Sequence, residues 1–527
     1  MNKPKVLLLF PNTSNEGVAP LAISILSTIA KQSGFEVKYF ETSFYQKSAT
    51  AGEEREQTGE FKPFDREHVF KLLPFERLQK DFKEIINTYK PDILAVSANS
   101  LEYDLFSDMM EQVIFKDKKL FVLVGGVHAT VAPDEVIVNK NVDALCVGQG
   151  EDAWQEFLSK FKNKQDITDI KNFWVKTNST IKKNPLRPLL SGDKLWEIEL
   201  DESYFDERHY SKPFDGKIYK RGQIELSRGC PFSCTYCVNS VFKNIYKGLG
   251  KFVCVRPFDN LKKRIITLVD RGFEILYFQD ECFLSIPYNT LEQFCTWYGK
   301  EVKLPLLLQT RPESVTEEKI KLISDMGVSV QVSLGVESGS ERILRDICNR
   351  GTTVAHIKKA FGLIKKYEFR SNAYTMIGFP TETREEVFET INLIRENKPD
   401  VSVMSVFYPF KWVPLRQFCI ERGYIDGTEK ARTFTEMSIL KNQPMSPEEI
   451  RNLRRTYRLY TKLPKEYFPK IQLCEKDYEN HKELFKELMF VKIDSLVELI
   501  DSLISRIIEL FREDIFEATI KSISVLL

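Results

Sequence analysis

The first 155 residues alternate between short apolar runs and longer stretches whose apolar positions recur at helical spacing. Compact apolar runs bounded by polar or glycine-containing segments are typical of buried strands, and a spacing of three or four residues is typical of packed helices. We expect strands at Lys5–Phe10, Phe35–Phe40, Ile93–Ser97, Leu120–Val124 and Ala144–Val147. We expect helices at Leu21–Gln32, Phe75–Tyr89 and Leu105–Phe115, with an irregular excursion over residues 46–74. This alternation predicts a parallel, doubly wound α/β sheet, whose ligands bind at the carboxyl ends of the strands.

A second series of alternating strands and helices follows a less regular stretch. We expect its strands to begin near Gln223, Ile275, Leu304, Val328, Ser371 and Val401, with helices that include Leu261–Asp270, Glu317–Met326, Val354–Lys366 and Arg384–Arg395. Six such units are too few for a closed eight-unit barrel, so they predict a partial (β/α)6 barrel or another parallel sheet. Between the two series, we expect a hairpin at Phe173–Val175 and Thr180–Lys182.

The last hundred residues have mainly helical patterns. Between residues 493 and 511, apolar side chains recur at helical spacing beside a polar face that is more acidic than basic, which favours packing on the core over a membrane surface. Pairing with a second copy of the chain is the alternative for this helix. The predicted organisation is a first α/β domain over residues 1–155, a linker over 156–219, a barrel domain over 220–420 and a helical C-terminal region over 421–527.

Composition excludes some classes of protein. The 527-residue chain has 76 Lys and Arg against 75 Asp and Glu, and its hydrophobic fraction of 43% is that of a globular protein. A net charge of +1 gives no support to nucleic-acid binding through a basic surface. No apolar run reaches the roughly 18 residues of a spanning helix, and no signal peptide is evident. We therefore expect a cytoplasmic protein whose ten cysteines are reduced thiols, metal ligands or catalytic groups and not disulfides.

Three closely spaced cysteines, Cys230, Cys234 and Cys237, follow the first strand of the second series directly. Their spacing is C-x3-C-x2-C, at a strand end where barrel enzymes build their active sites. Three thiolates hold three irons of a [4Fe–4S] cluster and leave the fourth iron open, as a catalytic metal requires. The alternative is a structural zinc site, which needs four ligands and would have to recruit Cys254.

This segment resembles the signature of radical S-adenosylmethionine (SAM) enzymes, C-x3-C-x-aromatic-C, with Tyr236 at the aromatic position. In that family the open iron chelates SAM, and one electron from the cluster cleaves it to methionine and a 5′-deoxyadenosyl radical. The resemblance covers residues 220–415 and extends to later strand ends. It implies SAM contacts from Tyr236, Gln279, Asp280, Glu281, Arg311, Ser333, Glu337, Gly378 and Phe379.

The first domain lacks the G-x-G-x-x-G fingerprint of dinucleotide binders in its first loop, residues 11–17. It resembles instead the cobalamin-binding domain that precedes many radical SAM enzymes, on the segments 125–130 and 147–151. The D-x-H-x-x-G motif, whose histidine ligates cobalt, is absent, so we expect cobalamin without an axial histidine. The resemblance implies cobalamin contacts from Asn12, Gly17, Ser97, Gly125, Gly126, His128, Gly148 and Gly150.

The combined resemblance implies a cobalamin-dependent radical SAM enzyme that methylates an unactivated carbon of a small molecule. A radical cyclase or rearrangement enzyme with the same cofactors is the alternative, and a non-catalytic metal- or ligand-binding protein is a further one. We expect Tyr408 and Trp412, after the sixth strand, to wall the substrate pocket. The expected partners are a reducing protein such as flavodoxin or ferredoxin and no nucleic acid, and the chain is expected to be a monomer or homodimer.

Overall fold

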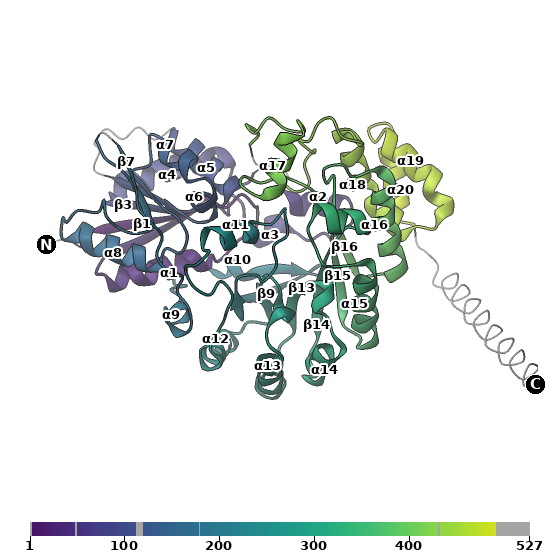
Figure 1. Ribbon diagram of the computed structural model, residues 1–527, viewed down its shortest axis with the longest axis horizontal. Coiled ribbons are helices and arrows are strands. Elements are labelled where there is room, and N and C mark those ends of the chain that lie inside the picture. Colours follow the sequence, from purple (N-terminus) through teal and green to yellow (C-terminus); the bar gives the residue numbers. More distant parts are fainter. Residues whose placement is uncertain (1–2, 48–49, 112–119, 179, 431–432, 492–527) are drawn as a thin grey trace, which may run out of the picture. The chain divides into compact units, whose positions relative to one another are not determined.

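The computed structural model of the chain describes residues 3–47, 50–111, 120–178, 180–430 and 433–491 (Figure 1). The chain separates into two compact units, Met1–Arg458 and Leu459–Leu527. The apolar helix that we predicted between residues 493 and 511 lies outside the described residues. The first unit contains both predicted α/β regions.

The first sheet is doubly wound, as the sequence predicts. Its parallel strands are β1 (Lys5–Phe10), β2 (Glu36–Glu41), β3 (Ile93–Ser97), β4 (Phe121–Gly125) and β5 (Ala144–Cys146). The strand order is β2-β1-β3-β4-β5, and the predicted hairpin, β6 (Phe173–Lys176) and β7 (Ile181–Lys183), extends it with antiparallel strands. The order reverses between β1 and β3, and ligands of such sheets bind at that reversal, beyond the carboxyl ends of the strands.

Strand β1 shows why this sheet has helices on both faces. Val6 and Leu8 belong to one apolar cluster, while Leu7 and Leu9 belong to another. The first cluster includes residues of α1 (Leu21–Gln32) and α8 (Glu151–Lys162), and the second includes residues of α4 (Phe75–Tyr89) and α5 (Ser100–Glu111). A strand buried on both faces is apolar throughout, which is the pattern that the sequence shows.

Helix α5 begins earlier than the predicted Leu105. Asn99 caps it, because its side-chain oxygen accepts a hydrogen bond from the Glu102 amide at 3.1 Å. The Glu102 carboxylate in turn accepts a hydrogen bond from the Asn99 amide at 2.7 Å. This reciprocal cap satisfies free amides of the first turn, and the apolar periodicity alone did not locate it.

The second sheet is the predicted partial barrel. Six parallel strands lie in the order β16-β15-β14-β13-β12-β9, and the antiparallel β8 (Ser211–Phe214) flanks β9. The parallel strands are β9 (Lys217–Ile224), β12 (Ile275–Phe278), β13 (Leu306–Thr310), β14 (Val330–Glu337), β15 (Arg370–Ile377) and β16 (Val401–Val406). The first of them starts at Lys217 and not at Gln223, because Asp215 and Gly216 adopt positive φ angles and close a hairpin between β8 and β9.

Helices follow the barrel strands along their outer side in Figure 1. They are α12 (Phe258–Asp270), α13 (Tyr288–Glu301), α14 (Glu317–Asp325), α15 (Val354–Lys366) and α16 (Arg384–Asn397). Three of them begin with a threonine whose side chain accepts a hydrogen bond from a first-turn amide, at Thr316, Thr353 and Thr383. Such caps stop each helix from extending into the preceding strand-end loop, where the barrel carries its chemistry.

The excursion over residues 46–74 is more ordered than predicted and contains α2 (Ala51–Gln57) and α3 (Arg66–Phe70). It packs on β16, the edge strand of the barrel. The buried Glu60 carboxylate accepts a hydrogen bond from the Met404 amide at 2.8 Å and pairs with Arg454 at 3.0 Å. Arg454 also donates to the Met404 carbonyl at 3.3 Å. Side chains therefore satisfy the exposed backbone groups of an edge strand.

The segment between the two sheets ties them together. It contains α9 (Asp193–Trp196) and α10 (Glu207–Tyr210). Asp201 accepts a hydrogen bond from Ser27 of α1 at 2.5 Å, and Glu202 pairs with Arg264 of α12 at 2.8 Å. Adjacent residues of the linker thus bind one helix from each sheet.

The C-terminal region is mostly helical from Pro447 to Met489, as predicted, whereas the described residues between 422 and 446 form turns and irregular backbone. In the first unit, α17 (Pro414–Glu421) follows the last barrel strand, and α18 (Pro447–Lys462) continues into the second unit. In the second unit, α19 (Phe468–Lys476) and α20 (Lys482–Met489) contact each other. None of the helices within the described ranges combines the length and the apolar character needed to cross a membrane.

Replacement of Glu60 by alanine should destabilise the first unit. The change leaves Arg454 buried without its carboxylate and the Met404 amide without its acceptor, so we expect the free energy of unfolding to fall by about 3 kcal/mol. Equilibrium urea unfolding followed by circular dichroism measures the loss. Glu67→Ala, at an exposed position of α3, is the control. A loss that matches this control would contradict the assigned role of Glu60.

Candidate functional site

The cysteine loop, residues 225–237, leaves the carboxyl end of β9 and is fixed by Asp280 at the carboxyl end of β12. The Asp280 carboxylate accepts hydrogen bonds from the Leu226 amide at 3.0 Å, and from the amide and hydroxyl of Ser227 at 2.5 Å each. The side chain is fully buried, and burial raises its pKa to about 7. Asp280 was predicted as a SAM contact, and the structure places its carboxylate on the backbone of the cysteine loop.

Cys230 and Cys234 are buried, and Cys237 is the half-buried residue before α11 (Val238–Ile245). Two side chains donate to the sulfurs: Arg311 Nη1 lies 3.3 Å from Cys234 Sγ, and Asn239 Nδ2 lies 3.8 Å from Cys237 Sγ. Burial raises the pKa of the Cys230 thiol to about 12 and also raises that of Cys237. Donors at the sulfurs suit an iron–sulfur cluster, and a bound metal is what deprotonates such thiols.

Cys254, the fourth ligand that a zinc site would need, lies in β11 (Cys254–Val255). This strand pairs with β10 (Ser227–Arg228), and the Cys254 side chain packs with Leu195 and Trp196. Among the residues that the structure describes, no three His, Cys, Asp or Glu side chains are placed to hold one metal ion together. A four-iron cluster binds each cysteine at a different iron, so it does not require that convergence.

Several predicted SAM contacts meet around one arginine, Arg350. It donates to the Tyr236 hydroxyl at 2.7 Å and to the Gly335 carbonyl at 2.7 Å, and it lies 3.3 Å from the Glu337 carboxylate. The Tyr236 ring packs edge-on against Phe379, with ring centroids 6.0 Å apart. The structure thus brings Tyr236, Glu337 and Phe379 together. Arg350 was not predicted, because it stands in a loop without periodicity or motif.

The remaining predicted SAM residues lie on separate strands: Ser333 stands within β14, and the others follow the ends of their strands. Ser333 accepts a hydrogen bond from Asn372 at 3.4 Å, and both side chains are buried. Gly378, at φ +83°, donates its amide to the buried Glu382 at 2.6 Å. The Gln279 amide donates a hydrogen bond to the Ile224 carbonyl of β9 at 2.9 Å. Arg311 pairs with Glu313 at 2.5 Å and lies beside Cys234, so its guanidinium stands next to the predicted cluster.

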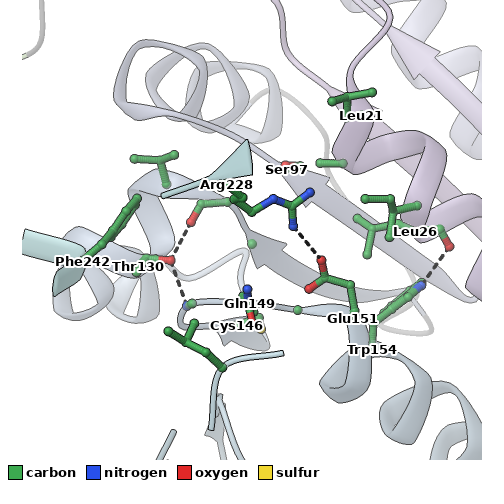
Figure 2. A pocket seen from close by; sticks show the side chains of 18 of the residues that line it. Leu21, Leu26, Ser97, Thr130, Cys146, Gln149, Glu151, Trp154, Arg228 and Phe242 are labelled. Atoms are coloured by element: carbon green, nitrogen blue, oxygen red, sulfur yellow. Dashed lines mark hydrogen bonds and ion pairs between the residues drawn. The ribbon is translucent and has the colours of Figure 1, made fainter. Parts of the chain in front are cut away.

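A cavity of about 450 Å³ opens at the carboxyl ends of the first sheet (Figure 2). Five of the predicted cobalamin contacts line it: Ser97, Gly125, Gly126, Gly148 and Gly150. A β-carbon on Gly125 would meet no atom closer than 3.8 Å, and one on Gly150 would meet none closer than 3.7 Å. Larger side chains at these two positions would project into the cavity, so the glycines keep space for a ligand.

The same cavity is also lined by residues within and beside the cysteine loop. Gly229 and Asn239 contribute to its lining, as does Glu281, whose pKa is raised by burial and then by the charge of Glu225. Arg228 pairs with Glu225 at 2.9 Å. It also pairs with Glu151 of α8 at 3.4 Å (Figure 2). The strand ends of both sheets therefore face one shared space.

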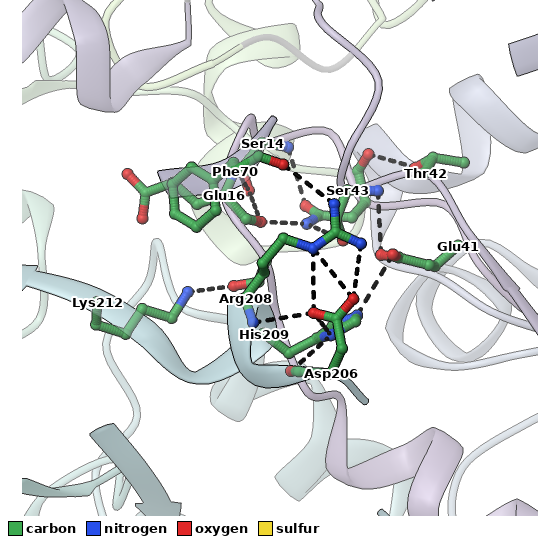
Figure 3. Close-up of polar contacts among 12 residues, drawn as sticks. Ser14, Glu16, Glu41, Thr42, Ser43, Phe70, Asp206, Arg208, His209 and Lys212 are labelled. Carbon is green, nitrogen blue, oxygen red and sulfur yellow. Dashed lines mark hydrogen bonds and ion pairs between the residues drawn. The ribbon is translucent and has the colours of Figure 1, made fainter. Parts of the chain in front are cut away.

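Asn12 and Gly17, two predicted cobalamin contacts, lie outside the lining of this cavity. Asn12 is buried and donates to the Ser43 hydroxyl at 2.9 Å. Gly17 packs on α10, where a β-carbon would stand 2.4 Å from the Arg208 carbonyl, and its own carbonyl accepts a hydrogen bond from Lys212. Figure 3 shows the polar contacts around this first loop. The linker therefore packs directly on Gly17, and Asn12 is engaged within the first domain, so the structure places neither residue at the cavity.

His128, the third predicted contact outside the lining, belongs to α6 (Val127–Val131) and is buried against α5. Its ring stacks on Tyr103 at 4.4 Å, and its Nδ1 lies 3.0 Å from the Ser100 hydroxyl. Burial lowers the pKa of His128 to about 4. These contacts give His128 a packing role.

The two predicted substrate-pocket residues differ in environment. The buried Tyr408 donates its hydroxyl to the Lys430 carbonyl at 2.6 Å and packs on Phe410, with ring centroids 4.8 Å apart. Trp412 is 59% exposed and has a φ of +67°, which is uncommon for a bulky residue. One side chain is therefore buried and the other exposed, and their role in the substrate pocket stays a prediction.

The chain matches two family models. Residues 224–394 match the Radical SAM superfamily, and residues 65–158 match the B12 binding domain. The first match contains the whole cysteine loop. The second contains the glycines at the strand ends of the first sheet.

Similar proteins include methyltransferases. The chain is 25% identical to an uncharacterized methyltransferase of Pyrococcus horikoshii, over 71% of this chain and 79% of that protein. It is 21% identical to the cytidylyl-2-hydroxyethylphosphonate methyltransferase of Streptomyces wedmorensis, over 85% of this chain and 88% of that protein. The solved structure of the radical SAM methyltransferase TsrM from Kitasatospora setae, with cobalamin and a [4Fe–4S] cluster bound, shares the fold. Its TM-score is 0.59 at 17% identity, over 82% of this chain and 76% of that one.

Substitution of Asp280 by asparagine should impair iron loading without unfolding the chain. Asparagine replaces one carboxylate oxygen by an NH2 group, which repels the Leu226 or Ser227 donor and releases the start of the cysteine loop. We expect the iron content after anaerobic reconstitution to fall severalfold while the far-ultraviolet circular dichroism is kept. Asp259→Asn, at a position whose side chain is 94% exposed, is the matched control. An unchanged iron content would show that the loop does not depend on Asp280.

Proposed function

Since the chain is a radical SAM enzyme with a B12-binding domain, we propose that it methylates an unactivated carbon of a small-molecule substrate. The observation that carries this proposal is the shared cavity. Its lining includes Gly125 and Gly148, from the strand ends of the first sheet, and Gly229 and Asn239, which adjoin the cysteines. A reaction that uses two cofactors on one carbon requires both to reach the same space.

The residues present fit both groups. Three cysteines with hydrogen-bond donors at their sulfurs suit a cluster, and glycines that leave the strand ends open suit cobalamin. Cys230, Cys234 and Cys237 would hold the cluster, and Ser97, Gly125, Gly126, Gly148 and Gly150 would line the cobalamin site. When bound, the cluster supplies the electron that cleaves SAM, and cobalamin supplies a carrier for the methyl group.

The residues around Arg350 would bind and orient SAM. Arg350 fixes the Tyr236 hydroxyl and lies 3.3 Å from the Glu337 carboxylate, which leaves that carboxylate with capacity to accept from a ribose hydroxyl. Phe379 would pack beside the adenine. Glu281, which opens on the cavity, would accept a hydrogen bond from the SAM amino group. Arg311, held at Cys234, would bind the SAM carboxylate next to the cluster.

Similarity to a methyltransferase over 85% of this chain supports methyl transfer, whereas the cyclases to which the chain is similar match 65% and 70% of it. Radical SAM enzymes typically act on small molecules and receive electrons from a reductant. We propose that a small reducing protein, such as flavodoxin or ferredoxin, reduces the cluster of this chain.

Label from the methyl group of SAM should appear in the product. The full chain is reconstituted with iron, sulfide and hydroxocobalamin, and is then incubated with a chemical reductant, trideuteromethyl SAM and a small-molecule extract. We expect 5′-deoxyadenosine together with a metabolite that has gained one trideuteromethyl group in place of a hydrogen, detected by mass spectrometry. A metabolite changed without the label would favour the cyclase or rearrangement alternative.

Removal of one cluster cysteine should abolish both products. Cys234→Ala leaves the cluster with two protein ligands, so we expect loss of most iron and a fall in 5′-deoxyadenosine of at least about 100-fold. Cys295→Ala, a buried cysteine of α13 in the apolar core, is the matched control. Retained iron and SAM cleavage in the Cys234 variant would overturn the assignment of the cluster.

A further inference from the structure

Helix α11 begins after the last cysteine of the cysteine loop and ends beside Gly148 and Gln149, which follow β5 of the first sheet. Cys237 precedes its first turn, and Tyr246 follows its last residue. Asn239, Phe242 and Tyr246 all line the shared cavity. Residues three or four apart lie on one side of a helix, so this cavity-facing side of α11 runs from the cysteines to the first sheet.

At its first end, the cavity-facing side contacts a cysteine. Asn239 is buried, and its Nδ2 lies 3.8 Å from Cys237 Sγ. Hydrogen bonds to cysteine sulfurs tune an iron–sulfur cluster, and small changes in their geometry change its properties. A displacement of α11 would therefore change the hydrogen bond between Asn239 and Cys237, and with it the environment of a bound cluster.

At its other end, α11 contacts the Gly148–Gln149 backbone. The Tyr246 hydroxyl accepts a hydrogen bond from the Gln149 amide at 2.6 Å, and the ring is buried. A β-carbon on Gly148 would stand 1.8 Å from that hydroxyl, so the absence of a side chain is what admits the tyrosine. The Gly148 amide is held at 2.9 Å by the hydroxyl of Thr130, which also lines the cavity.

We propose that α11 couples the cobalamin site to the cluster, with Tyr246 as the positioning residue for the Gly148–Gln149 loop. The loop is held between Thr130 on one side and Tyr246 on the other, so its geometry depends on where α11 ends. The start of α11 depends in turn on Cys237, whose position a bound cluster would fix. Cluster loading should therefore favour the loop geometry that binds cobalamin, and a coupling of this kind acts equally in both directions. The inference requires both cofactors but no particular reaction.

The experiment compares cobalamin affinity with and without the cluster. The full chain is prepared anaerobically in iron-free and iron-reconstituted forms, and each is titrated with hydroxocobalamin and followed by visible absorbance. We expect the reconstituted wild-type chain to bind severalfold more tightly than the iron-free chain. In Tyr246→Phe, loss of the hydroxyl leaves the Gln149 amide unpaired, so we expect about tenfold weaker binding by the reconstituted protein. The two forms of this variant should bind equally.

Two further variants keep the proposal falsifiable. Tyr298→Phe removes a hydroxyl that donates to the Leu304 carbonyl at 3.0 Å in the barrel core, and it should keep both the affinity and the ratio between the two forms. Asn239→Leu removes the donor at Cys237 with little change in volume. It should reduce the ratio of the affinities of the two forms, because the helix then loses its hydrogen bond to the cluster cysteine.

The ratio between the two forms decides the proposal. Equal affinities of the two wild-type forms would overturn it. A wild-type ratio that persists in Tyr246→Phe would also overturn it, because Tyr246 would then be only part of the cavity wall. The titrations involve no substrate and no turnover, so they are unaffected if the methylation proposed above fails.

Discussion

The carboxylate of Asp280 fixes the point at which the first parallel strand of the barrel turns into the cysteine loop. It accepts three hydrogen bonds from Leu226 and Ser227, at a position closed to solvent. The position of the following residues depends on this anchor. Arg228 pairs with Glu151, Gly229 lines the cavity, and the three cysteines come next in the loop. A buried carboxylate that accepts from two backbone amides and one hydroxyl of the same loop gives that loop a fixed geometry that apolar packing does not provide.

The cavity exists because two parallel sheets present their carboxyl ends to the same space, and the structure holds that arrangement through contacts far apart in the sequence. The linker binds α1 through Asp201 and α12 through Glu202. The Arg228–Glu151 pair crosses between the sheets at the cavity itself. Each pair taken singly contributes modestly, but together they restrict the relative rotation of two layers, and a reaction between two cofactors depends on their alignment.

The two α/β series were predictable because buried strands and packed helices leave a periodic pattern in the sequence. The cysteine spacing and the strand-end glycines were predictable because they are local, and five of the eight predicted cobalamin contacts line the cavity. The remainder depends on contacts between distant segments. Gly17 lies in the first loop, where we expected a cobalamin contact. However, α10, nearly 200 residues later in the chain, packs on it. Arg350 and Tyr246 carry no motif, and only the folded chain shows what their polar atoms contact.

A barrel with six parallel strands has two exposed edges, and the way this chain protects one of them explains why the first domain carries an excursion. An unpaired edge strand invites association with another chain. At β16, the Met404 amide donates a hydrogen bond to Glu60, and the Met404 carbonyl accepts one from Arg454. Arg55 donates to the Ser405 hydroxyl at 2.8 Å. Two of these three side chains come from the first domain. The excursion therefore stands where further strands would continue the barrel, and the first domain completes this edge within one compact unit.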